Sequence, residues 1–64
     1  MAKWIIEATP QGTFDVFRDR RPVAYDRDDM DEALRCVQWH PDWDPRSDSI
    51  EVEDLDGYRS PVRL

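Results

Sequence analysis

One segment of this 64-residue chain has the apolar spacing of a helix, and this restricts the fold more than any other feature. The apolar residues recur at intervals of three and four: Met30, Ala33, Leu34 and Val37. Outside this segment apolar and polar residues alternate, as they do on half-buried strands. Because one helix covers only one face of a sheet, the sequence predicts an α+β fold with a helix packed on one side.

Five segments have strand character, three before the helix and two after it. They cover residues 3–8, 13–18, 23–25, 49–53 and 58–64. Asp56-Gly57 is a hairpin signal between the last two, and Pro61 places the fifth strand at an edge because it has no backbone N–H. We therefore predict a single domain over residues 1–64, an antiparallel sheet in the order β-β-β-α-β-β.

The ends of the helix carry their own signals. Asp29 with Glu32 approximates a capping box, and carboxylates in the first turn favour the positive end of the helix dipole. The helix has to end near Trp39, because Pro41 disfavours helical geometry at the residue before it. At about 100° per residue, Trp39 lies roughly opposite Met30 and is expected to point away from the core.

The segment after the helix, residues 39–45, is aromatic and acidic and is stiffened by two prolines. Exposed Trp is a frequent hot-spot residue at protein interfaces. A candidate partner-binding surface is therefore formed by Trp39, Asp42, Trp43 and Asp44. For Trp43 two interpretations stay open: a contact residue, or a lid over a core that needs all the apolar area a short chain offers.

A second candidate surface is the sheet face that the helix leaves uncovered. By strand alternation Ile5, Phe17 and Ala24 are expected on this outer face. An uncovered apolar face favours a homodimer or another partner. The alternative is a scatter of single exposed apolar residues, which needs no explanation.

The sequence has no recognisable catalytic or ligand-binding motif. Cys36 and His40 are one turn apart, but Cys36 lies near the C-terminal end of the helix, where the dipole disfavours a thiolate. His40 with two nearby aspartates lacks the further ligands that a metal site requires. Two glycines exclude the usual phosphate-binding loop. We expect a protein that is not an enzyme and has no cofactor and no metal site.

The net charge of −6 lies in the second half of the chain: residues 28–64 sum to −7, and residues 1–27 to +1. Because such a field repels phosphates, direct nucleic-acid binding is not expected, even at the arginine cluster of residues 18–21. Seven carboxylates instead offer a spaced acidic array: Asp42, Asp44, Asp48, Glu51, Glu53, Asp54 and Asp56. A single cysteine and the lack of a signal peptide or long apolar run predict a cytoplasmic protein.

The first forty residues resemble small uncharacterised bacterial and phage domains with a β-β-β-α order. The matching pieces are Lys3-Trp4-Ile5-Ile6, Gly12-Thr13-Phe14-Asp15-Val16 and Asp31-Glu32-Ala33. The resemblance implies a fold but no activity.

Our leading hypothesis is a non-enzymatic protein-binding or regulatory module, phage-encoded or accessory, that contacts a protein partner through the aromatic-acidic surface. The alternatives are an acidic nucleic-acid mimic that occupies a DNA-binding protein, and a small homodimeric structural protein.

Overall fold

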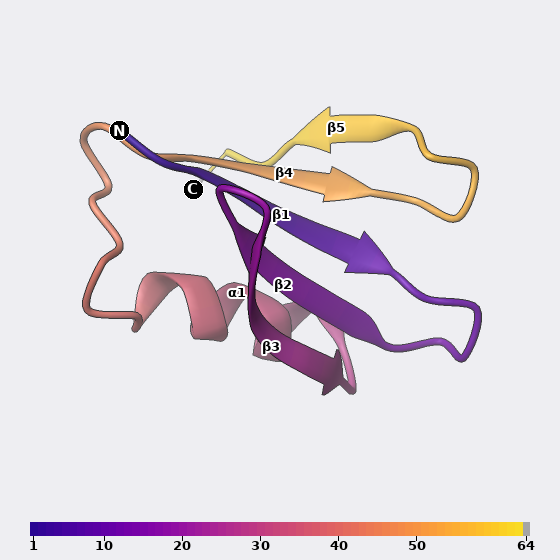
Figure 1. The fold of residues 1–64 in the computed structure, drawn as a ribbon. Coiled ribbons are helices and arrows are strands. Elements are labelled where there is room, and N and C mark those ends of the chain that lie inside the picture. Colours follow the sequence, from indigo (N-terminus) through magenta and orange to yellow (C-terminus); the bar gives the residue numbers. More distant parts are fainter. Residues whose placement is uncertain (64) are drawn as a thin grey trace.

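The computed structural model describes residues 1–63, in which one helix packs against one face of a five-stranded sheet (Figure 1). The elements are β1 (Lys3–Ala8), β2 (Phe14–Arg18), β3 (Arg21–Arg27), α1 (Met30–Gln38), β4 (Ser49–Glu53) and β5 (Arg59–Pro61). The predicted α+β class and element order are confirmed. The fifth strand is shorter than predicted, and Leu64 lies outside the described residues.

The sheet has the order β3-β2-β1-β4-β5 and is mixed, whereas the sequence predicted antiparallel pairing throughout. β1 pairs with β4 in parallel, with Ile6 opposite Val52, and the other three pairs are antiparallel. The parallel pair arises because α1 and the loop after it carry the chain back to the end of the sheet where β1 begins (Figure 1). A parallel pair requires such a long crossover. β5, with Pro61, lies at an edge as predicted.

The core lies between the sheet and the helix. Its buried residues come from β1, β2, β4 and α1 and from the residue before β1: Ala2, Trp4, Ile6, Val16, Ala33, Val37 and Ile50. The helix begins as predicted, because the Asp29 carboxylate accepts a hydrogen bond from the Glu32 N–H at 2.8 Å. It ends as predicted as well, with Trp39 as its C-cap. No helix among residues 1–63 is long and apolar enough to cross a membrane.

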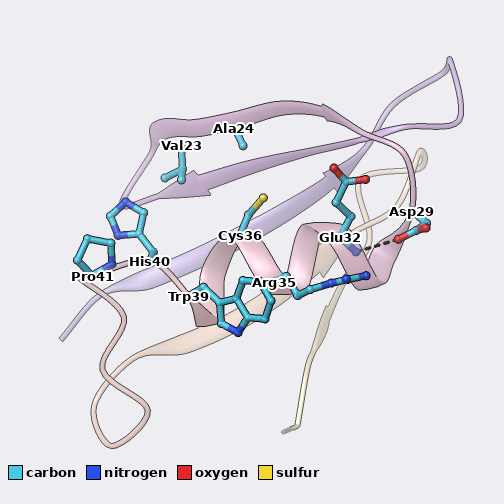
Figure 2. Close-up of a pocket in the computed structure, with 9 residues that line it drawn as sticks. All are labelled: Val23, Ala24, Asp29, Glu32, Arg35, Cys36, Trp39, His40 and Pro41. Atoms are coloured by element: carbon cyan, nitrogen blue, oxygen red, sulfur yellow. Dashed lines mark hydrogen bonds between the residues drawn. The ribbon is translucent and has the colours of Figure 1, made fainter.

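β3 is longer than the predicted third strand and irregular. Its register against β2 shifts twice, and Asp26 between the shifted pairs has a positive φ of 56°. Such bulges break the two-residue alternation of side chains. As a result Val23 and Ala24 both pack toward the core, and Figure 2 shows both pointing toward the helix. The expected place of Ala24 on the outer face is therefore wrong.

Candidate functional site

Trp39 is the most exposed aromatic side chain among residues 1–63, with 78% of its surface accessible. Its backbone N–H donates to the Arg35 carbonyl at 3.0 Å, so its backbone completes the last helical turn. The outward direction predicted from helical phase is confirmed.

A groove of about 660 Å³ runs between β3 and α1, and Trp39 forms part of its wall (Figure 2). The apolar part of the lining is Val23, Ala24, Cys36, Trp39 and Pro41, and the polar part is Asp29, Glu32, Arg35 and His40. In Figure 2 the Cys36 sulfur points between the helix and β3, toward the groove's apolar wall. The groove is therefore apolar near the end of the helix and acidic near its start.

The acidic end of the groove is built by the first turn of α1. One carboxylate oxygen of Asp29 caps the helix. Glu32 forms an ion pair with Arg27 of β3 at 3.3 Å, which ties the helix to the edge strand. Arg35 lies along the helix and donates from Nε to the Asp31 carbonyl at 3.4 Å. Residues 28–38 hold four carboxylates against this one guanidinium, so the first turn is acidic.

Trp43 lies away from this groove and packs on the core. Its ring meets that of the fully buried Trp4 edge to face, with centroids 6.1 Å apart. His40 contacts the same Trp4 ring at 5.1 Å. Trp43 instead borders a separate hollow of about 400 Å³ with Pro45. Of the two interpretations that the sequence leaves open for Trp43, the geometry supports a lid over the core. Trp39 and Trp43 therefore do not form one surface.

The two aspartates of the candidate surface differ in role. Asp44 closes a turn, because its carboxylate accepts from the Ser47 hydroxyl at 2.8 Å and from the Arg46 N–H at 3.0 Å. The hydrogen bond from Ser47, followed by that from Arg46, lowers the pKa of Asp44 below its ordinary value. Asp42 stays exposed, 3.9 Å from His40 Nδ1. Of the four predicted residues, Trp39 and Asp42 remain accessible without a turn or core role.

Asp48 is a structural residue that sequence reasoning placed only in the acidic array. Its carboxylate accepts from the indole N–H of buried Trp4 at 2.9 Å and from the Ala2 N–H at 2.8 Å. It also accepts from the Asp44 N–H at 3.2 Å. The Trp4 hydrogen bond is the main reason that the pKa of Asp48 falls to about 2. The Trp on the first predicted strand was the available signal, since a buried indole N–H needs an acceptor.

Most of the predicted acidic array is engaged within the molecule. Asp54 accepts from the backbone N–H groups of Asp56 and Tyr58 in the β4–β5 turn. Glu51 pairs with Lys3 at 3.5 Å, and Glu53 pairs with Arg59 at 2.8 Å. With Asp44 and Asp48 also engaged, five of the seven carboxylates have internal partners. Cations pair with Glu51 and Glu53, and neutral donors hold Asp44, Asp48 and Asp54 in turns and at the core. These internal contacts weaken the resemblance to a row of phosphates.

The outer sheet face is largely charged. Ile5 is 7% exposed and lies opposite Phe17 in the β1–β2 pair. Phe17 is half-buried, and its ring packs edge to face against that of Tyr25, with ring centroids 6.4 Å apart. The ion pairs from β1, β4 and β5 described above lie on the same side. Ile5 and Phe17 are thus on the outer face as expected, but the apolar area that they present is small.

Two side chains of chemical interest, Cys36 and His40, line the groove. Among residues 1–63, no group of three or more potential ligand side chains gathers around a point that suits a metal ion. Cys36 is a free, half-buried thiol in the groove wall. His40 Nδ1 accepts from the Asp42 N–H at 3.0 Å, which leaves any proton of the neutral ring on Nε2.

Comparison with family models, with curated proteins and with solved structures finds no match to this chain. The resemblance of residues 1–40 to small bacterial and phage domains therefore stays a prediction.

Proposed function

We propose that the protein is a non-enzymatic protein-binding module whose contact surface is Trp39 together with the groove between β3 and α1. The observation that carries this proposal is an indole with 78% of its surface in water beside an apolar-walled groove. Trp is the residue type most enriched at interface hot spots, and hot spots lie next to pockets that exclude water.

The free energy available from this single side chain is substantial. A Trp buries about 150–250 Å² when it is fully enclosed, and roughly 25 cal/mol is gained per Å² of apolar surface. Covering the exposed part of Trp39 is therefore worth about 4 kcal/mol before the costs of association. Rigid attachment to the end of a helix keeps the entropic part of those costs low.

The surface differs from the one predicted from the sequence. Trp43 and Asp44 leave it, because they hold the core and a turn, and the groove walls from β3 enter it. Asp42 stays at its margin, two residues beyond His40. The acidic character of the predicted surface persists through the first turn of α1 rather than through the loop aspartates.

Affinity capture with a Trp39→Ala variant tests the proposal. Tyr58→Ala is the matched control, because Tyr58 is 71% exposed but lies at the far hairpin between β4 and β5. We expect wild type and the Tyr58 variant to retain the same proteins, identified by mass spectrometry, and the Trp39 variant to lose them. If the Trp39 variant keeps every partner while folded, the groove is not the contact surface.

A further inference from the structure

The groove between β3 and α1 has an apolar end and an acidic end, and this polarity restricts what fits there. The apolar end is formed around Trp39, Cys36 and Val23, and the acidic end by Asp29 and Glu32. We infer that its occupant is an extended segment of a partner protein that carries one basic and one apolar residue about three positions apart. The inference rests on the proposed function and adds the chemical class of the partner.

Charge complementarity defines the basic position. Two carboxylates, Asp29 and Glu32, and one guanidinium, Arg35, line the groove, and the molecule as a whole carries −6. Glu32 gives one oxygen to Arg27 at 3.3 Å, and Asp29 gives one oxygen to the helix cap. Each carboxylate thus keeps a second oxygen for a Lys or Arg side chain of the partner. An acidic segment would be repelled at the same place.

The helix sets the spacing between the two anchors. Glu32 and Trp39 are seven residues apart on one helix face, and at 1.5 Å per residue this is about 10 Å. Three residues of an extended chain in the polyproline II conformation cover about 9 Å, at about 3.1 Å each, and because this conformation repeats every three residues, side chains three positions apart lie on the same face. A basic and an apolar side chain three positions apart therefore reach both anchors.

The size of the groove favours an extended segment over a helical one. A helix about 10 Å across that spans the same 10 Å occupies roughly 800 Å³. That exceeds the groove volume of about 660 Å³, part of which is open to solvent. The free edge of β3 is a poor strand partner, because Pro22 and two register shifts interrupt it. The side chains of the segment, rather than a continued sheet, then supply the contact.

Synthetic ten-residue peptides provide the probe. Each has one Arg and one Leu, separated by one to five positions in a background of Ser, Thr and Gln, with both termini blocked. Cys36 provides a site-specific readout, because it is the only cysteine and lines the groove. Its rate of reaction with a thiol reagent is measured with and without peptide, alongside the dissociation constant.

We expect the tightest binding and the strongest protection of Cys36 at a separation of three. Asp29→Asn with Glu32→Gln keeps a capping side chain and removes both charges, and we expect affinity to fall roughly three- to ten-fold with a weaker salt dependence. Asp56→Asn in the far hairpin is the charge control and is expected to leave the affinity unchanged. Trp39→Ala is expected to reduce it roughly thirty-fold or more.

Three results would overturn the inference. Equal binding at every separation would show that the groove does not select the spacing of the two side chains. Unchanged affinity of the variant with Asp29→Asn and Glu32→Gln would show that the groove does not select a basic residue. Trp39-dependent capture of proteins would then still support the proposed function. A second copy of the chain would be the occupant if, without peptide, Cys36 became better protected as the protein concentration rose and light scattering gave the mass of a dimer.

Discussion

The structure assigns opposite roles to two tryptophans four residues apart, and alanine substitutions separate them. Full burial makes a Trp→Ala change cost about 3–5 kcal/mol. Trp43 is half-buried, so we take about half of that value for its lost apolar contacts. The edge-to-face contact with Trp4 adds about 0.5–1.5 kcal/mol. We therefore expect Trp43→Ala to lower the free energy of unfolding by about 2–4 kcal/mol.

This loss is large for so small a domain. At about 0.05–0.15 kcal/mol per residue, a chain of 64 residues has a total stability of about 3–10 kcal/mol. Each kcal/mol lowers the Tm of such a domain by about 4–8 °C, so Trp43→Ala is expected to lower it by about 8–30 °C. Trp39→Ala removes an exposed side chain and is expected to stay within about 0.5 kcal/mol of the wild type.

Urea unfolding followed by far-UV circular dichroism measures both variants, with thermal melts as a second reading. The denaturant slope should stay constant, so that a shift of the midpoint reports stability alone. If Trp39→Ala destabilises as much as Trp43→Ala, the indole of Trp39 is part of the core and the proposed contact surface is wrong. If neither variant loses stability, Trp43 does not act as a lid.

Three further predictions concern charge and backbone. The pKa of Asp48 is lowered to about 2, mainly by the Trp4 indole N–H. The stability that the ionised carboxylate contributes is therefore present above the ordinary pKa of 3.8 and is lost as pH falls from there toward 2. Melting temperatures measured along an acid titration should show this loss, and the Asp48→Asn variant should lack this pH dependence. The pKa of Glu7 is raised above its ordinary value of 4.5, first by burial and then by Glu53, so the fold loses stability as pH rises from 4.5 through the raised pKa. Glu7→Lys should raise the free energy of unfolding by about 0.2–1 kcal/mol at pH 7, measured by urea unfolding. An unchanged free energy of unfolding at pH 7 would contradict the repulsion between Glu7 and Glu53. Arg20 has a φ of 69° in the β2–β3 turn, so Arg20→Gly should stabilise the domain by about 1 kcal/mol, and an unchanged midpoint would show that the turn is not strained.

Local signals in the sequence predicted the helix well. The cap at Asp29, the end of the helix near Trp39 and the outward indole all depend on residues within one or two turns of each other. Such interactions follow from helical geometry without knowledge of the rest of the fold. The same reasoning identified the edge position of the strand with Pro61, because a missing N–H acts locally.

Features that depend on distant parts of the chain were missed. The parallel pairing of β1 with β4 joins segments more than forty residues apart, and no turn signal specifies it. The two bulges of β3 reversed the expected side for Ala24, since a one-residue shift moves a side chain to the other face. Asp48 appeared as one acid among many, because its role depends on where the indole N–H of Trp4 comes to lie.

A core this small gains from every indole that it can bury, and two of the three indoles contact it while Trp39 does not. Trp4 lies inside the core and Trp43 covers it, whereas His40, the residue after Trp39, contacts the Trp4 ring at 5.1 Å. Helical phase places Trp39 on the far side, and the turn after it brings His40 and then Trp43 to the core instead. The chain thus fixes this indole beside the groove at the expense of about 4 kcal/mol of burial. Under the proposed function, a partner that covers Trp39 recovers this burial.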